Sequence, residues 1–273
     1  MTLPEPLFLP GSAGALFALY IPAEQRGDRG VVLLPPFAEE MNRARRMLRL
    51  QAAALSQNRI AALLLDPFGT GDSAGDFADA RWETWIADVR VAVSALSAHG
   101  AQRIGLLGVR LGAALAVAAA STLALPCFAT ALWQPVVHGH RHLTEFLRLR
   151  ALPAASNASR PATVEMMRAC LAAEKTVEVA GYDVVPPMAA ALDALDLGEL
   201  AHRALGRVMW FEVVHDRLLP LSAAGARCVA AWTTSGLTVS TEAIPGPAFW
   251  SGQGNAIVPD LISATTAAFE EAP

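Results

Sequence analysis

A short stretch near the middle of the chain, LLGVRLGAA at residues 106–114, combines the residue types of a buried strand, a tight glycine turn and a small-residue helix. In the pattern G-x-S-x-G, such a turn presents a nucleophilic serine at the carboxyl end of a sheet. The central residue here is Arg110. A guanidinium stays protonated and has no lone pair with which to attack a carbonyl carbon. The turn therefore predicts a site whose central side chain is not a nucleophile.

Arg110 could instead bind an anion. Its side chain carries five N–H donors, and the helix that we expect after it directs free backbone N–H groups toward the same place. This combination suits a carboxylate, phosphate or sulfate oxygen of a ligand. It also suits a carboxylate of the protein, in which case the arginine fills the pocket with an internal ion pair. The acids that we expect beside it are Glu40 or Glu39, and after them Asp216.

The loop PPFAEEMNRARRM, residues 35–47, follows an expected inner strand and carries the nearest acids. In a sheet with this turn, the loop supplies a backbone N–H to the oxyanion hole, so its side chains lie near the turn. Glu39 and Glu40 are candidate general bases for water, or acids that stabilise a helix start, with Glu39 and Arg43 in i,i+4 spacing. The residues that we expect to contribute to binding are Phe37, Asn42, Arg46, Val109, Arg110, Leu111, Trp133 and Trp250.

A serine triad also needs an acid after a later strand and a histidine after the last one. Asp216, in WFEVVHDRLLP, stands where the acid belongs and is a third catalytic candidate. The segment PGPAFW places Pro247, Phe249 and Trp250 where the histidine belongs. His215 precedes Asp216 and would be a base out of chain order. Ester hydrolysis by a Ser-His-Asp triad is therefore not expected.

The other reactive residue types are better explained by structure. Ser73 and Ser251 have no adjacent base, Asp66 is placed to bond its own loop, and Cys127 should lie at the opposite end of the sheet. The glycine-rich GTGDSAG lacks the spacing of a phosphate or dinucleotide loop. No metal and no cofactor is predicted, because the neighbouring histidines alternate in a basic stretch without a carboxylate motif, which favours solvent exposure of His138, His140 and His142.

Short apolar runs alternate with longer amphipathic stretches, as in a mostly parallel α/β sheet with helices on both faces. The region of residues 7–20 could add an antiparallel hairpin at one edge. The expected strands cover residues 31–34, 60–65, 104–107, 129–133, 208–214 and 237–244. The expected helices cover residues 41–56, 82–98, 111–120, 223–233 and 256–270.

The interval of residues 137–205 is too long for an ordinary crossover between parallel strands. We interpret it as a partly helical cap inserted into a single domain, residues 1–273. Insertions of this kind lie over the carboxyl ends of the strands, where ligands bind. The predicted cap should therefore cover the pocket at Arg110.

Composition limits the partners. The chain has 273 residues, 53% of them hydrophobic, and a net charge of −4, without a basic run paired with aromatic residues, which excludes nucleic acid as an expected partner. The start MTLPEPLFLP does not resemble a signal peptide, so the cytoplasm is the expected location, and no apolar run is long enough for a transmembrane segment. We allow for a homodimer. Reduced, buried thiols are expected at Cys127, Cys170 and Cys228.

Two loops carry a family resemblance. The segment DPFGTGDS and the turn at residues 108–112 are similar to the α/β-hydrolase superfamily. The combination PPFAEEMNRARRM, GDSAGDFADARWETW, GVRLGA and PGPAFW more specifically resembles the bacterial exosortase A system-associated hydrolases, type 2. This resemblance implies the α/β-hydrolase fold. It also implies a hydrolase that works beside machinery for exopolysaccharide export and for sorting PEP-CTERM surface proteins.

Two classes of function remain open at this point. In the first, the protein is an enzyme in which Arg110 holds an anionic substrate while Glu39 or Glu40 activates water. In the second, it is a non-catalytic binding or scaffold protein that keeps the pocket for an anionic acyl, lipid-linked or sugar-linked small molecule.

Overall fold

The computed structural model describes residues 3–124, 126–151, 163–216, 218–251 and 256–273. Its main feature is an eight-stranded sheet in the order β1-β2-β4-β3-β5-β6-β9-β10. The strands from β4 to β10 are parallel, and the hairpin of β1 and β2 adds an antiparallel edge, as predicted. The bounds are β1 Glu5–Pro10, β2 Ala15–Ile21, β3 Arg29–Leu34, β4 Ile60–Leu65, β5 Arg103–Val109, β6 Ala129–Trp133, β9 Arg207–Val214 and β10 Val239–Pro245.

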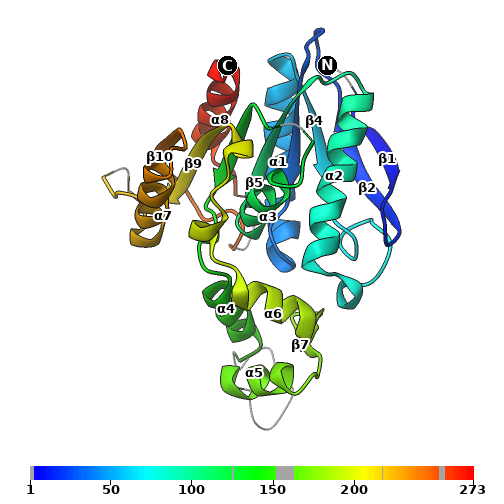
Figure 1. The fold of residues 1–273 in the computed structure, drawn as a ribbon, viewed down its shortest axis with the longest axis vertical. Coiled ribbons are helices and arrows are strands. Elements are labelled where there is room, and N and C mark those ends of the chain that lie inside the picture. Colours follow the sequence, from blue (N-terminus) through cyan, green and yellow to red (C-terminus); the bar gives the residue numbers. More distant parts are fainter. Residues whose placement is uncertain (1–2, 125, 152–162, 217, 252–255) are drawn as a thin grey trace.

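Helices cover both faces of this sheet (Figure 1). On one face, α1 (Glu39–Gln57) and α8 (Pro259–Glu271) pack on every second residue of the strands, such as Val31 and Leu33. On the other face, α2 (Trp82–Ala98), α3 (Leu111–Ala120) and α7 (Ala223–Thr234) pack on the alternate residues, such as Val32 and Leu34. Because successive strand residues point to opposite faces, the continuous apolar runs fill both cores.

The predicted elements differ from the structure mainly at two ends. Residues 256–258 lie outside α8, which begins at Pro259, a residue whose fixed φ and missing N–H suit the first helical position. Residues 237 and 238 lie outside β10, because the Leu237 N–H closes the end of α7 by bonding the Trp232 carbonyl. Both differences shift an expected boundary and leave the element in place.

The segment between β6 and β9 forms a separate group of elements beyond the carboxyl end of β6 (Figure 1). It contains α4 (Gly139–Ala151), α5 (Val164–Ala172), the β7–β8 hairpin (Val177–Val179 and Tyr182–Val184) and α6 (Pro186–Ala194). Helix α4 contacts α5, α6 and β7. This segment therefore supplies a layer of side chains next to the turn at Arg110.

One of the three thiols expected to be buried is exposed. Cys170 on α5 is exposed, because α5 turns only Met167 and Leu171 inward. Cys127 and Cys228 are buried as expected.

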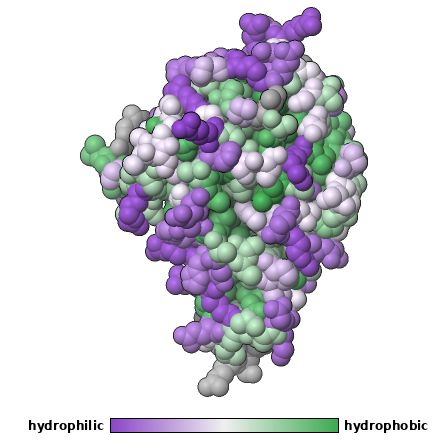
Figure 2. Space-filling view, viewed as in Figure 1, coloured by the Kyte–Doolittle hydropathy of each residue, from purple (hydrophilic) through white to green (hydrophobic). Residues whose placement is uncertain are grey.

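On the face shown in Figure 2, hydrophilic residues are distributed over the sheet and its helices and over the segment between β6 and β9. Within the described ranges, no helix combines the length and apolar character needed to cross a bilayer, and no cluster of three metal-ligating side chains occurs.

Asp88 on α2 is a buried acid that gives a test of the fold. One of its oxygens accepts the Phe68 N–H at 2.9 Å, while the other has no hydrogen-bond partner within the described structure. Burial raises the pKa of Asp88 to about 6, although the bond from Phe68 opposes this. A raised pKa in the folded state means that Asp88 supports stability when protonated. That contribution is lost as the pH rises from the ordinary pKa of 3.8 through about 6.

We therefore expect D88N, which is neutral at every pH, to gain in melting temperature relative to the wild type as the pH rises through this range. The amide oxygen can still accept the Phe68 N–H. The measurement is thermal unfolding across pH, with E83Q on the exposed side of the same helix as a control that should follow the wild type. A difference between D88N and wild type that stays constant with pH would contradict the assignment.

Candidate functional site

The turn at Arg110 has the geometry of a nucleophile elbow. Strand β5 ends at Val109 and α3 begins at Leu111, with Arg110 between them at φ 54° and ψ −116°. This conformation costs a residue with a side chain about 1–3 kcal/mol. A Cβ on Gly108 would lie 2.2 Å from the Gly112 carbonyl oxygen, and one on Gly112 would lie 2.3 Å from that of Pro35. Both glycines are needed for this close packing.

The loop between β3 and α1 faces the elbow. Its residue Ala38 also has a positive φ, 50°, and α1 begins immediately after it, so that Glu39 and Glu40 lie in the first helical turn. Negative charge is favourable at this end of a helix. The close contact of Gly112 with Pro35 fixes the loop against the start of α3. The acids predicted beside Arg110 are thereby held at the same end of the sheet.

Arg110 is paired with Glu40, which confirms the first choice among the expected acids. The Arg110 Nε lies 3.3 Å and 3.4 Å from the two carboxylate oxygens of Glu40, and the two side chains are 17% and 21% exposed. Glu145 on α4 lies 3.9 Å from Arg110 Nη2, and the Trp250 ring centroid lies 5.5 Å from the guanidinium carbon. Within the described chain, Arg110 Nη1 has no hydrogen-bond partner.

The other two expected acids do not reach Arg110. Glu39 pairs with Arg43 at 3.1 Å in the i,i+4 direction of α1, on a more exposed side of the helix. Asp216 is exposed in the loop after β9, where its carboxylate accepts the Leu218 N–H. His215 is exposed beside it. The position of Asp216 after β9 agrees with that of a triad acid, but the side chain bonds only its own loop in the described structure.

Glu40 is unusual in its titration. Burial raises its pKa above the ordinary range, and this effect exceeds the opposing attraction of Arg110, while the negative charge of Glu145 raises it further. Ionised Glu40 is therefore less favourable in the folded protein than in water, in spite of its ion pair. The pair compensates a cost of burial more than it adds stability.

Two cavities of about 270 Å³ each meet at Arg110, His142 and Glu145. The first, which we name the aromatic cavity, is lined by Phe37, Glu39, Glu40, Arg43, Arg110, His142, Glu145, Phe146, Leu149, Trp250 and Ser251. The second, which we name the polar cavity, is lined by Arg110, Gln134, Pro135, Val136, Val137, His138, Arg141, His142, Glu145, Ser222 and Ala224.

His142 corrects the expectation that the three histidines of this stretch are exposed. His138 and His140 are partly exposed and lie next to Asp196 and Asp193, but His142 is buried, and its ring packs on Phe37 with centroids 5.8 Å apart. Neither ring nitrogen has a hydrogen-bond partner among the described residues. Burial, with a smaller contribution from Arg110, lowers its pKa to about 3. The imidazole is neutral at physiological pH.

Phe37 and Phe146, which line the aromatic cavity, belong to a larger aromatic cluster. Phe37 makes edge-to-face contacts with Phe77, Trp85 and Phe146 at centroid distances of 5.2–6.1 Å. Tyr182 of β8 joins the cluster through Phe77 and Phe146. Sequence reasoning missed the members that come from the segment between β6 and β9. The available signal was the i,i+3 and i,i+4 spacing in HLTEFL, which places His142, Glu145 and Phe146 on one side of α4.

Several residues predicted to contribute to binding lie elsewhere. Trp133 and Val109 belong to the core under α1 and α8, where the Trp133 indole donates to Thr265 at 2.8 Å. Asn42 and Arg46 are exposed on α1, and the Asn42 amide donates to the Tyr182 hydroxyl at 3.1 Å. Of the eight predicted residues, Phe37, Arg110 and Trp250 line the aromatic cavity.

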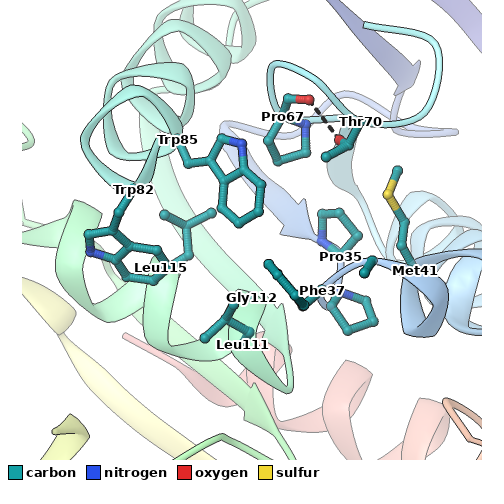
Figure 3. Close-up of a pocket in the computed structure, with 12 residues that line it drawn as sticks. Pro35, Phe37, Met41, Pro67, Thr70, Trp82, Trp85, Leu111, Gly112 and Leu115 are labelled. Atoms are coloured by element: carbon teal, nitrogen blue, oxygen red, sulfur yellow. Dashed lines mark hydrogen bonds between the residues drawn. The ribbon is translucent and has the colours of Figure 1, made fainter. Parts of the chain in front are cut away.

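Leu111 lines a third, apolar cavity between the loop after β3, α2 and α3 (Figure 3). Trp82, Trp85 and Leu115 point into it from the helices. Its volume is about 10 Å³. That is the space of a single water molecule, so this cavity is a packing gap rather than a ligand site.

Two loop interpretations are confirmed. Asp66 Oδ2 bonds Arg45 at 3.1 Å and accepts the Asp72 N–H, and the Ser73 hydroxyl donates to the Asp66 carbonyl. Burial raises the pKa of Asp66, against the attraction of Arg45. Ser251 is exposed at the rim of the aromatic cavity, and its hydroxyl bonds only the Ala248 carbonyl in the described chain.

Comparison with solved structures places this geometry in a known fold. Est1E from Butyrivibrio proteoclasticus, solved with ferulic acid, has a TM-score of 0.69 at 14% identity, over 97% of this chain and 98% of that one. The Pyrococcus furiosus esterase Pf2001 has a TM-score of 0.65 at 14% identity, over 99% and 91% of the chains. An α/β serine hydrolase homologue from Coxiella burnetii has a TM-score of 0.59 at 13% identity, over 98% of both.

No protein-family model and no curated protein sequence matches the chain. The structural matches show that the chain has the α/β-hydrolase fold, as the sequence predicts. Within that fold, Arg110 occupies the elbow that would present a serine. Trp250 lies against Arg110 and comes from the segment that follows the last strand.

Proposed function

We propose that this protein binds a small anionic ligand with an apolar part at Arg110, and that it does not carry out serine-type ester hydrolysis. The observation that carries the proposal is the arginine in the strained elbow, with two cavities beside it. A strained turn is retained where it aims a side chain at a site. Here that side chain is a five-donor cation, which is a group for binding oxygen anions.

Arg110 has donors to offer in spite of its pair with Glu40. Glu40 lies beside Nε, and Glu145 lies at a longer 3.9 Å from Nη2. Nη1 has no partner in the described structure, so its two N–H groups are open to a ligand oxygen. Phe37, Phe146 and Trp250 provide an apolar surface next to these donors. A ligand that joins an anionic group to an apolar group would use both features.

A pair of variants that differ only at residue 110 tests this proposal. We expect E40Q to bind phenyl phosphate or benzoate more tightly than the wild type, because the arginine no longer has a competing carboxylate. We expect R110M/E40Q to lose at least about tenfold in affinity, as for a lost hydrogen bond to a charged group. Isothermal titration of both anions and of benzyl alcohol measures the effect. Equal affinities of the two variants for both anions would overturn the proposal.

The raised pKa of Glu40 supports a second candidate, hydrolysis without a serine. Arg110 would hold the substrate anion and Glu40 would act as general base on water, since a base is most effective when its pKa approaches the working pH. This candidate requires hydrolysis of an anionic ester, such as the mono-4-nitrophenyl ester of succinic acid, that persists after fluorophosphonate treatment and falls by about 10²-fold or more in E40Q. A rate equal to that of the free buffer would exclude it.

We also infer a cellular context from the resemblance of PPFAEEMNRARRM and PGPAFW to exosortase A system-associated hydrolases. In that context, the protein acts in the cytoplasm beside exopolysaccharide export. Its ligand would then be lipid-linked or sugar-linked. Deletion of the gene should change exopolysaccharide yield or PEP-CTERM protein sorting, and complementation by a variant without Arg110 should fail to restore it.

A further inference from the structure

The polar cavity, which shares Arg110 with the aromatic cavity, differs from it in charge. Glu39, Glu40 and Glu145 outnumber Arg43 and Arg110 around the aromatic cavity. Around the polar cavity, Arg110 and Arg141 outnumber Glu145, while His138 is held by Asp196 at 3.3 Å. An anionic group is therefore more favourable in the polar cavity, although Arg110 lines both cavities.

His142 is a buried polar side chain between the two cavities that lacks a partner among the described residues. It lines both cavities, it is buried, and neither ring nitrogen has a partner in the described chain. An unsatisfied buried polar group destabilises a protein, and nearly all such groups in proteins are paired. Since the imidazole is neutral, it offers one N–H donor and one acceptor. Both ring nitrogens are themselves enclosed by the protein, so a ligand oxygen would accept the N–H only after the ring turns toward the cavity.

Arg141 adds a second guanidinium. It is exposed at the rim of the polar cavity and forms no ion pair or hydrogen bond with the described residues. Glu145, four residues later on α4, is turned toward Arg110 instead. Gln134 contributes a further amide N–H₂, because its carbonyl oxygen is already bonded to the Val213 N–H at 2.7 Å. The cavity thus combines two guanidinium groups with two neutral donors.

Ser222, at the start of α7, adds little to this set. The N–H and hydroxyl of Ser222 donate to the buried carboxylate of Glu212 at 2.7 Å and 3.0 Å. The Ser222 hydroxyl also accepts the Gly225 N–H and so caps the helix. Ser222 itself therefore offers no free donor to a ligand.

We propose that the polar cavity binds a phosphoryl group, so that the ligand is a phosphomonoester of an apolar alcohol whose apolar part lies in the aromatic cavity. The inference rests on the proposed function, because it names the ligand class of the same site. A carboxylate has two oxygens, whereas a phosphate has three strong acceptors and close to two charges, which two guanidinium groups and two neutral donors match better. Arg110, at the boundary, contacts the phosphoryl group from the side of the ester bond.

The experiment compares three ligands by isothermal titration. Phenyl phosphate carries the phosphoryl and the apolar part, inorganic phosphate only the first, and benzoate an apolar part with a carboxylate. For the wild type, we expect phenyl phosphate to bind about tenfold more tightly than either of the others. Equal affinity for phenyl phosphate and benzoate would overturn the phosphoryl assignment and leave anion binding at Arg110 intact.

Three exposed positions on α4 provide matched variants that need not disturb folding. R141Q should weaken phenyl phosphate about tenfold and benzoate less than twofold, as for one hydrogen bond between charged groups. R148Q, on the same helix but outside both cavities, should leave both affinities unchanged. E145Q should strengthen the binding of phenyl phosphate severalfold. It removes a carboxylate that lies 3.9 Å from Arg110 Nη2 and repels the negatively charged ligand.

The outcomes separate the two proposals. Equal effects of R141Q and R148Q, or weaker phenyl phosphate binding in E145Q, would overturn the phosphoryl site. If R110M/E40Q binds each of the two ligands, benzoate and phenyl phosphate, as tightly as E40Q does, the proposed function fails. The phosphoryl site then fails with it. Finally, H142F keeps the ring volume and removes the ring nitrogens. It should weaken phenyl phosphate severalfold, and an unchanged affinity would count against the proposal.

Discussion

Replacing Arg110 with methionine is expected to destabilise the fold by about 2–3 kcal/mol near pH 8, and a second change, E40Q, is expected to restore most of that loss. The single variant leaves the carboxylate of Glu40 without its partner, whereas the double variant leaves a neutral amide. Fully buried pairs that lose one partner cost about 3–5 kcal/mol, and exposed pairs contribute 0–1 kcal/mol. Glu40, about one-fifth exposed, lies between these limits.

The pKa of Glu40 gives the sign of the pH dependence. It is already raised by burial, and removal of Arg110 takes away the main influence that lowers it. A raised pKa in the folded state supports stability at low pH and withdraws that support as the pH rises through it. The loss in R110M should therefore shrink when the pH is lowered toward 5. In the wild-type background, E40Q should leave stability near its starting value.

Glu39 offers the matched comparison. Its ion pair with Arg43, at 3.1 Å, is shorter than the pair of Glu40 with Arg110, at 3.3 Å, but it is more exposed. Both acids lie in the first turn of α1, so the effect of the helix dipole is similar for the two. If distance decided the energy, R43M would cost more than R110M. We expect the reverse, with at most about 0.5 kcal/mol for the i,i+4 pair.

Thermal and urea unfolding of R110M, E40Q, R110M/E40Q and R43M measure these terms. A loss of 2–3 kcal/mol corresponds to a shift in melting temperature on the order of 5–10 °C for a chain of this size. R110M as stable as the wild type at pH 8 would show that the Glu40 carboxylate does not need its partner. A double variant less stable than R110M would show that the two side chains contribute separately.

The elbow and its first partner could be predicted because they depend on local pattern. Glycines at 108 and 112 specify a tight turn wherever the strand lies, and the loop after β3 must end at the same edge of the sheet because the strands are parallel. Glu40 follows from these two facts. The prediction that Trp133 contributes to binding ignored the alternation of side chains along β6. One step along a strand reverses the face that a side chain meets, and Trp133 points into the core under α1 and α8.

The contribution of α4 could not be predicted in the same way. Its sequence is helical and amphipathic, but which loop meets its apolar side depends on how the whole segment packs beyond β6. The polar residues of HGHRH suggested solvent, and burial of His142 reverses that expectation because His142, Leu143, Phe146 and Leu147 form the buried side of the helix. A histidine on the inner side of an amphipathic helix is the signal that would have identified it.

A serine placed at residue 110 is not expected to create an esterase. We expect neither the wild type nor R110S/E40Q to be labelled by a fluorophosphonate probe, and we expect R110S/E40Q to hydrolyse 4-nitrophenyl acetate no faster than the wild type. The E40Q change is included so that the loss of Arg110 does not leave a buried carboxylate. In a serine hydrolase, removal of the base alone lowers turnover by about 10⁶-fold, so a serine without its base gives little activity.

The physical reason lies in the groups that surround the elbow. Trp250 approaches residue 110 from the segment after β10, and an indole cannot take a proton from a serine. His142 lines both cavities, and its pKa of about 3 makes it a weak base. Burial is the main cause of that low value, so most of it would remain without Arg110. Asp216 bonds its own loop and orients no histidine there.

A variant of His142 therefore tests whether this imidazole could act as the missing base. Removal of Arg110 takes away one cause of the low pKa of His142, so the imidazole in R110S/E40Q is a somewhat better base than in the wild type. If R110S/E40Q were labelled at residue 110, and if the added change H142F removed the labelling, α4 would supply the base that the segment after β10 lacks. That result would contradict our reading of the site as one for binding. Labelling of another serine, in the wild type as well, would contradict it more directly. In the described structure the hydroxyls of Ser73 and Ser251 bond only backbone groups, so we expect neither to react. We expect intact-mass spectra of both proteins without an adduct.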